Sequence, residues 1–441
     1  MGDFFSTLSS YLWGWPMVIL LLGTHLYLTI RLGFPQRKIF KGIKLSISKD
    51  EGAIGDVSQF SALATSLAAT IGTGNMIGVA IAISMGGPGA VFWCWMTGVL
   101  GIATKYGESL LSVMYRTTNK DGEMCGGPMY VLERGLNMKF MGILFALFTA
   151  LAAFGIGCTV QANAISTLFY DSWHIPLYVT GGVVALLAGL VFFFGVQGIG
   201  KVCSALVPFM AIFYVFGCLF LLWQNSAYLG ESLRLIVTSA FTPQAASGGF
   251  VGSTMLIASR FGIARGLFSN ESGLGSAPIV AAAAQTHHPV RQALVSSTAT
   301  FWDTVVVCAI TGLALVSSVL AYPDITGLES GLLTNQAFNK IPYIGSTLLS
   351  IGIFTFAFST ILGWGYYSQK AIEYLGGSRW ILPYRFVFVV MIFFGSVINL
   401  DIVWAAADCM NALMALPNLL SLLLLSGVIA HETKAYLYGK D

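Results

Sequence analysis

Long apolar runs separated by short polar segments make up most of the 441-residue chain. Eleven of these runs are long enough to cross the hydrocarbon core of a bilayer as helices, which takes about 20 residues each. The first run covers residues 12–30, and the others cover about residues 59–85, 89–115, 140–169, 175–195, 202–224, 250–284, 291–320, 343–374, 380–398 and 401–429. The pattern predicts an all-α polytopic membrane protein.

Composition supports this class. Charged residues make up 9% of the chain and hydrophobic residues 56%, whereas a soluble domain carries about 25% charged residues. The net charge of +3 is too small to indicate a nucleic-acid partner. The seven cysteines form no C-x-x-C pair, so we interpret them as small buried apolar residues. We expect a lipid bilayer as the surroundings and no organic cofactor.

Basic residues indicate the topology. The segment after the first run contains Arg31, Arg37, Lys38, Lys41 and Lys44. By the positive-inside rule this segment is cytoplasmic and the N-terminus is external. It forms a solvated loop or a basic helix on the membrane surface. Eleven crossings then place the C-terminal tail in the cytoplasm, as expected for a multi-pass protein of the cell membrane.

The second run is interrupted by the sequence GTGN at residues 72–75. Backbone groups cannot bond to lipid, so an unwound patch inside a membrane helix must face protein, water or a ligand. Its free carbonyl groups suit a cation, and the amides that start the next half-helix suit a carboxylate. Alternatively, the glycines only allow close packing of neighbouring helices.

A second interruption, GLFSNESGLGSAP at residues 266–278, opens the second half of the chain. Each half holds five runs, and an odd number inverts the second half relative to the first. Paired interruptions at corresponding positions favour an inverted-repeat secondary transporter with its site at the bilayer midplane. The predicted parts are residues 1–50 (extra helix and basic loop), 51–225 (first repeat, broken at 72–75), 226–430 (second repeat, broken at 268–276) and 431–441 (tail).

The run GGPGAVFWCWMTGVLG at residues 86–101 resembles the signature of the alanine/glycine:cation symporter family, also called the sodium:alanine symporter family. That family usually reads FWMW where this chain has FWCW. GTGN and FSNESGLGSAP also resemble the family, and the similarity extends from residue 59 to the tail. The resemblance implies a leucine-transporter-like fold, with a five-plus-five inverted repeat after one extra helix. It also implies Na⁺-coupled symport of small neutral amino acids such as alanine and glycine by alternating access.

The two interruptions outline a substrate pocket. Backbone amides near Gly72, at Thr73 and Gly74, could hold a carboxylate, and carbonyl groups of Phe268, Ser269 and Asn270 could accept from an ammonium group. A zwitterion needs both ends satisfied, because an unpaired charge in a low dielectric is costly. The small residues that would leave backbone exposed are Gly72, Gly74, Gly273 and Gly275.

Two side chains from other spans could complete this pocket. Gln161 is polar and must face the bundle, where it could donate to the carboxylate or form a hydrogen bond between helices. Trp364 could cap the pocket or simply pack in the core.

Neutral oxygen ligands for a cation occur in the span over residues 343–374. Ser359 and Thr360 resemble the hydroxyl ligands of the second sodium site of the family fold, which carbonyl groups of Ala68 and Ile71 would complete. Asn75 and Ser269 similarly match a first cation site beside the substrate. In the alternative interpretation, each hydroxyl bonds only to a carbonyl of its own helix.

Charged residues within the spans are costly unless paired or hydrated, and are therefore functional candidates. They are Lys105, Glu108, Arg260, Arg265, Glu271, Asp303, Asp401 and Asp408. Glu271 could gate the pocket, carry a proton or pair with Arg265 or Arg260, and we favour the pairing. If coupling is to H⁺, Glu271 and Asp303 are the candidate carriers.

Other classes fit the sequence less well. An enzyme would need a catalytic constellation, and the chain contains no HExxH or GxSxG motif. A channel would use repeated filter loops, whereas the two interruptions here are unlike each other. The closer alternative is a transporter of the same fold that uses H⁺ or carries another small solute.

Overall fold

Helices make up nearly all of the computed structural model, which describes residues 2–243, 250, 253–325, 332–398 and 401–439. A two-stranded sheet pairs β1 (Thr117–Thr118) antiparallel with β2 (Met124–Cys125). Helices are expected here because a chain surrounded by lipid must satisfy its backbone polar groups internally.

The chain begins with helices that precede the two predicted repeats. They are α1 (Gly2–Leu12), α2 (Trp15–Arg31), η1 (Pro35–Lys38) and α3 (Ile39–Ser46). The chain bends by 66° after α2. α3 packs on α15 (Pro289–Thr300), where a side-chain carbon on Gly42 would lie 2.4 Å from the carbonyl oxygen of Leu294. The basic segment thus contains a helix seated on the protein.

The first half of the chain contains five spans, of which the first is broken. They are α4 (Gln59–Thr70) with η2 (Gly74–Gly78) and α5 (Val79–Gly86); α6 (Gly89–Met114); α8 (Lys139–Ala152) with η4 (Ala153–Thr159) and α9 (Val160–Trp173); α10 (Leu177–Phe193); and α11 (Gly195–Gln224). Short elements α7 (Pro128–Tyr130) and η3 (Val131–Gly135) precede α8. The two parts of the broken span are bent by 51°.

The second half repeats this order. Its spans are α13 (Met255–Asn270) with α14 (Pro278–Ala281); α15 with η6 (Phe301–Cys308) and α16 (Ala309–Ala321); α18 (Gly345–Gly376); η7 (Ser378–Trp380) with α19 (Ile381–Val397); and α20 (Asp401–Leu424). The connecting and terminal elements are η5 (Ser226–Tyr228), α12 (Leu229–Phe241), α17 (Leu332–Phe338) and α21 (Ser426–Tyr438). These bounds agree with the predicted spans to within a few residues, except that the run over 250–284 is helical only at its two ends.

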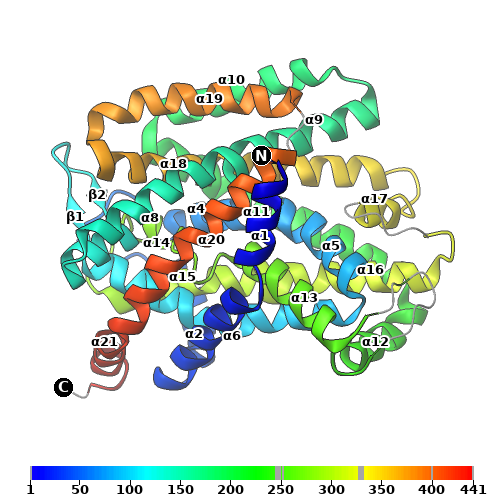
Figure 1. The fold of residues 1–441 in the computed structure, drawn as a ribbon, viewed down its shortest axis with the longest axis horizontal. Coiled ribbons are helices and arrows are strands. Elements are labelled where there is room, and N and C mark those ends of the chain that lie inside the picture. Colours follow the sequence, from blue (N-terminus) through cyan, green and yellow to red (C-terminus); the bar gives the residue numbers. More distant parts are fainter. Residues whose placement is uncertain (1, 244–249, 251–252, 326–331, 399–400, 440–441) are drawn as a thin grey trace.

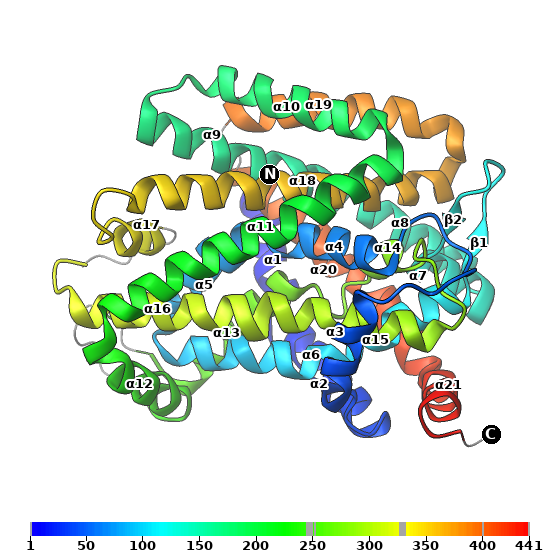
Figure 2. The same cartoon turned by 180° about the vertical axis from the view of Figure 1, so that it is seen from behind.

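Corresponding helices of the two halves pack against each other. α6 packs on α15, α8 on α18, and α10 on α19, while α5 contacts α13. Figures 1 and 2 show α10 and α19 side by side along one edge and α2 and α12 toward the opposite edge, with α4 and α18 between them. This pairing of counterparts is the arrangement of an inverted repeat, and it brings the two broken spans to the middle of the bundle.

Both broken spans stop where the backbone leaves the helical region. After α4, Ile71 has extended dihedral angles (φ −75°, ψ 93°). After α13, Glu271, Gly273 and Gly275 have φ angles of 54°, 93° and 85°. Glycine reaches positive φ at little steric cost, so the glycines of the second interruption allow a turn that most residues would resist.

Six of the described helical segments are long and apolar enough to cross a membrane alone, and two bent pairs bring this number to eight. The first bent pair covers residues 15–46 and the second covers residues 59–86. A shorter apolar helix, α10, lies beside α19. The helix count is consistent with the predicted architecture.

Candidate functional site

The two broken spans meet directly. A side-chain carbon on Gly74 would lie 3.5 Å from Cδ1 of Phe268 and 3.6 Å from Cα of Ser269. On the other side of the first break, a side-chain carbon on Gly72 would lie 2.5 Å from Oγ1 of Thr360. The small residues of the first break therefore permit contact with both α13 and α18, as a shared site requires.

Asn75 holds the first break in its unwound form. The side-chain oxygen Oδ1 of Asn75 accepts a hydrogen bond from the backbone amide of Gly72 at 2.9 Å, and the backbone amide of Asn75 donates to the Gly72 carbonyl at 3.2 Å. The Gly72 amide is thus already used within the break, and the amides of Thr73 and Gly74 remain those predicted for a substrate carboxylate.

Gln161 faces the first break from α9, as predicted for a polar residue that avoids lipid. Its Oε1 accepts from Oγ1 of Thr73 at 3.3 Å, and its Nε2 donates to the carbonyl oxygen of Ile156 at 3.0 Å. The hydrogen bond between helices is therefore present, and it places an amide side chain beside Thr73.

Trp364 lies fully buried between α9 and the second break. Its Nε1 donates to Oε1 of Glu271 at 3.0 Å. A side-chain carbon on Gly157, in η4, would lie 2.6 Å from Cβ of Trp364. The indole is therefore fixed in position, because Gly157 permits its close approach and Glu271 holds its polar end.

The expected ion pair of Glu271 with Arg265 or Arg260 is wrong. Within the described part of the chain, Glu271 has no arginine within ion-pair distance, and its second carboxylate oxygen accepts from the hydroxyl of Ser276. The left-handed conformation at Glu271 turns the chain away from the helix that carries both arginines. The electrostatic partner of Arg265 is instead Asp408.

The two hydroxyl groups on α18 converge on the end of α4. Oγ of Ser359 and Oγ1 of Thr360 donate to the carbonyl oxygen of Ala68 at 3.1 and 3.2 Å. Both also donate to the carbonyl oxygen of Phe356, at 2.8 and 3.0 Å. Ile71 ends the same helix as Ala68. The structure thus gathers the two hydroxyl oxygens and the Ala68 carbonyl oxygen where a cation site was predicted, and it adds the Phe356 carbonyl to them.

Asn75 and Ser269 also come together, on either side of a carboxylate. Nδ2 of Asn75 donates to Oδ1 of Asp303 at 2.8 Å, and Oγ of Ser269 donates to Oδ2 at 3.0 Å. The hydroxyl of Thr304 is a further donor at 2.6 Å, and Asp303 is completely buried. The sequence marked Asp303 as a charged residue within a span and as a candidate proton carrier, but not as a neighbour of Asn75 and Ser269. That signal could have identified it as a member of this site.

Glu108 holds the second break from α6. Its Oε1 accepts from the amides of Gly273 at 2.9 Å and Gly275 at 3.2 Å, and from Nδ2 of Asn418 at 2.6 Å. The Gly273 amide is therefore already hydrogen-bonded to the Glu108 carboxylate. A side-chain carbon on Gly273 would lie 2.5 Å from Leu21 of α2, so the site has no room for a larger residue. The sequence did not connect Glu108 with the break.

Other polar groups complete the surroundings of the second break. Asn270 accepts from the Ser272 amide at 2.9 Å and donates to Oγ1 of Thr97 at 3.3 Å. Lys105 is fully buried, and its electrostatic neighbours are the carboxylates of Glu108, Glu271 and Asp303. Its Nζ has no hydrogen-bond partner among the described residues.

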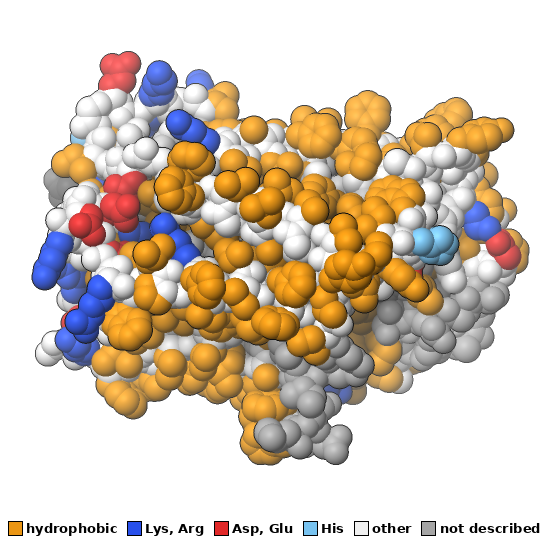
Figure 3. Space-filling view, turned by 90° about the horizontal axis from the view of Figure 1, so that it is seen from above, with side chains coloured by type: hydrophobic (Ala, Val, Ile, Leu, Met, Phe, Trp, Pro, Cys, Tyr) orange, Lys and Arg blue, Asp and Glu red, His pale blue; other side chains and the backbone are white. Residues whose placement is uncertain are grey.

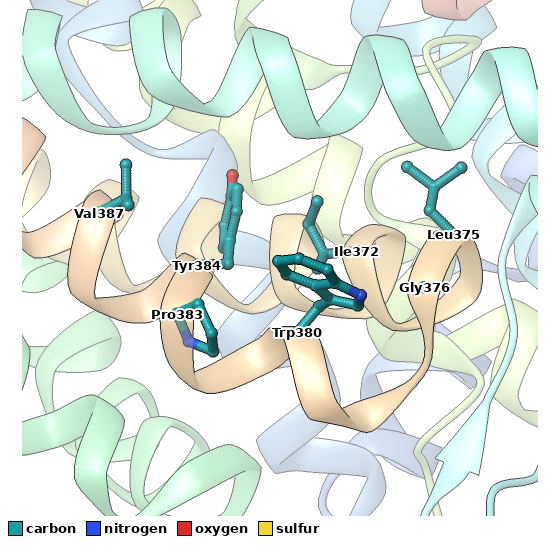
Figure 4. Close-up of a pocket in the computed structure, with 7 residues that line it drawn as sticks. All are labelled: Ile372, Leu375, Gly376, Trp380, Pro383, Tyr384 and Val387. Carbon is teal, nitrogen blue, oxygen red and sulfur yellow. The ribbon is translucent and has the colours of Figure 1, made fainter.

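Among the cavities outside this centre, two contrast in their lining residues. One of about 180 Å³ lies between α1, α13 and α20, and Phe268 lines it together with Arg265 and Asp408. The other, of about 370 Å³, is apolar and is lined by the end of α18, η7 and α19 (Figure 4). None of the predicted site residues lines the second cavity.

The fold has counterparts among solved structures. The solved structure of MhsT in complex with L-phenylalanine is similar over 88% of this chain and 91% of that chain, with a TM-score of 0.56 and 13% sequence identity. At this identity the likeness shows the fold alone, which is leucine-transporter-like with two inverted repeats.

The model of the sodium:alanine symporter family matches residues 1–441, and the chain belongs to this family. It is a multi-pass transporter and not an enzyme. The sodium/alanine symporter AgcS of Methanococcus maripaludis is 48% identical over 98% of this chain and 96% of its own length. The probable sodium/glutamine symporter GlnT of Bacillus subtilis is 36% identical over 96% of this chain and 88% of its own length.

Proposed function

We propose that this protein couples the uptake of alanine or glycine to Na⁺ by alternating access. The observation that carries the proposal is the meeting of two unwound helices with a pair of hydroxyl groups, all buried at the centre of the bundle. Such a centre offers backbone groups to a small zwitterion and oxygen ligands to a cation. The name of the AgcS relative supports alanine and Na⁺.

The proposed substrate site lies between the breaks. Amides of Thr73 and Gly74 bind the carboxylate, and carbonyl groups of residues 268–270 accept from the ammonium group. Gln161 orients the carboxylate end through its contact with Thr73. Trp364 closes the site on the side of α18, and its bond to Glu271 limits its movement.

Two proposed cation sites flank the substrate. The carbonyl groups of Ala68 and Ile71 and the hydroxyl groups of Ser359 and Thr360 form a neutral one. Asn75 and Ser269 form another, for which the carboxylate between them, Asp303, supplies a negative charge. Oxygen ligands of this kind suit a hard monovalent cation.

The proposed orientation places the N-terminus outside and the C-terminus in the cytoplasm. Figure 3 shows charged side chains gathered at one end of the molecule and apolar side chains over the middle. The end with β1 and β2 carries most of these charges, which supports its assignment to the cytoplasmic side. Residues 51–225 and 226–430 are the proposed repeats.

Uptake of labelled alanine into proteoliposomes tests this function. Uptake should require an inward Na⁺ gradient and should stop when choline replaces Na⁺. Uptake that follows only a pH gradient would favour H⁺ coupling. Uptake of glutamine without alanine would favour the solute in the name of the GlnT relative.

Competition should reveal a size limit in the same assay. We expect excess glycine to reduce alanine uptake and excess leucine or phenylalanine to leave it unchanged. The reason is that Trp364, Phe268 and the close contacts at Gly157 leave room for only a small side chain. Strong competition by phenylalanine would contradict this pocket.

Replacing Glu271 by Gln should reduce transport and preserve alanine binding in detergent. Gln keeps the shape and one acceptor for Trp364 but removes the charge beside the second break. Trp364→Phe, which removes the donor of the same bond, should also reduce transport. Loss of alanine binding in a folded Glu271→Gln protein would instead place Glu271 in the substrate site.

A further inference from the structure

Two segments lie against each other at the charged end of the molecule, near β1 and β2, and each is joined to one of the two broken spans. Residues 54–57 lead into α4, and residues 282–286 follow α14. We name these two segments the exit latch. The Gln285 amide donates to the carbonyl oxygen of Val57 at 2.8 Å, and Val57 forms a parallel bridge with Ala284. The exit latch therefore ties the first broken span to the second.

The contact within the exit latch is close. A side-chain carbon on Gly55 would lie 2.5 Å from both the carbonyl carbon and the carbonyl oxygen of Ala284. The backbones touch directly and leave no passage between the two segments at this point. A solute leaving the site on this side would need the segments to separate.

Arg116 joins both segments from a third part of the chain. It follows α6, and its Nη1 donates to the carbonyl oxygens of Ala282 at 3.0 Å and Ala284 at 2.8 Å. Its Nη2 donates to those of Ile54 at 3.0 Å and Thr286 at 3.2 Å. One guanidinium group thus bridges both sides of the exit latch.

We infer that Arg116 is the releasable clamp of the exit latch and that its four hydrogen bonds hold the inner path shut. The inference rests on the proposed function, because alternating access requires the inner path to open, and we place that opening between the two segments of the exit latch. The hydrogen bonds between Arg116 and one of the two segments must then break in every cycle. Arg116 is a positioning residue, since it acts through the two segments and lies apart from the proposed substrate site.

Arginine suits this role chemically. A guanidinium presents five donors in a rigid plane, whereas an ammonium group on Lys is a single point charge. The four acceptors are neutral carbonyl groups, and the carboxylate of Asp56, whose charge also acts on Arg116, keeps its own hydrogen bond from the Met124 amide when the clamp opens. This makes the clamp reversible.

The contacts of Asp50 with His287 and Arg291 lie beside the clamp and should keep the Arg116 variants folded. Asp50 accepts from the His287 amide at 3.0 Å and lies 3.4 Å from Nε of Arg291. Burial opposes ionisation of Asp50, but the hydrogen bonds from His287 and the charge of Arg291 outweigh it and lower its pKa. These contacts remain when Arg116 is replaced.

Hydrogen–deuterium exchange in detergent tests the clamp without a transport assay. In Arg116→Gln, peptides covering residues 54–57 and 283–286 should exchange faster by about tenfold or more, the change expected from losing a hydrogen bond to a charged donor. Arg116→Lys keeps the positive charge but loses the planar guanidinium and its several donors, so the exchange rates of the two segments should lie between those of the wild type and Arg116→Gln. Alanine uptake should fall in the same order.

Arg134→Gln is the matched control. Arg134 lies at the same end and donates to the Arg116 carbonyl at 3.3 Å, but in the described part of the chain it has no hydrogen bond to the exit latch. It should leave exchange at both segments unchanged. Unchanged exchange at both segments in folded Arg116→Gln would overturn the clamp, as would an equal rise in α10 and α19. If the wild type carries no alanine but exchange responds as expected, the clamp stands and the proposed substrate fails.

Discussion

Thr360→Ala should weaken the apparent affinity for Na⁺ by about 5- to 150-fold, as the loss of about 1–3 kcal/mol per missing ligand predicts. The hydroxyl of Thr360 lies 3.2 Å from the Ala68 carbonyl and adjoins Gly72 at the first break. Because the proposed ion and substrate share this break, binding of each should strengthen binding of the other. Alanine affinity at fixed Na⁺ should therefore also fall. Alanine uptake measured over a range of Na⁺ concentrations gives both values.

Thr355→Ala is the control for this experiment. Thr355 lies on the same helix, but among the described residues its hydroxyl donates only to the Ile351 and Gly352 carbonyls of that helix. Its removal should leave the Na⁺ dependence nearly unchanged. Equal effects of the two substitutions, or none from Thr360→Ala, would remove Thr360 from the cation site.

Glu108→Ala should destabilise the second break and abolish transport. The substitution leaves the amides of Gly273 and Gly275 without their acceptor, and each unsatisfied buried donor costs about 1–3 kcal/mol. The two amides together predict a loss of about 2–6 kcal/mol in the free energy of unfolding. Thermal unfolding in detergent, with alanine uptake measured alongside, tests this expectation.

Glu108→Gln separates hydrogen bonding from charge at this position. Its carbonyl oxygen can still accept from Gly273 and Gly275, and Oε2 of Glu108 has no partner among the described residues. We therefore expect this variant to retain most of the stability that Glu108→Ala loses. If Gln and Ala are equally destabilising, the charge beside Lys105 matters more than the contacts to the break.

The positions of the spans and of both breaks follow from local sequence. An apolar run surrounded by lipid has to form a helix, because only a helix satisfies its backbone groups internally. The sequence GTGN and the glycines at 273 and 275 lie inside single apolar runs and disfavour a continuous helix there. Both breaks could therefore be predicted from the sequence. The hydroxyl pair Ser359 and Thr360 was predicted as a cation site from its resemblance to the second sodium site of the family fold, and helix spacing alone would not have singled it out.

Tertiary structure alone decided which polar groups meet. Asn75 and Asp303 are 228 residues apart, and Glu108 and Gly273 are 165 residues apart. Local spacing carries no information on such pairs, because the packing of helices from the two repeats determines them. The error at Glu271 has the same origin. The two arginines are near Glu271 in sequence, but the left-handed backbone conformation of Glu271 itself directs its carboxylate toward Trp364 of another helix.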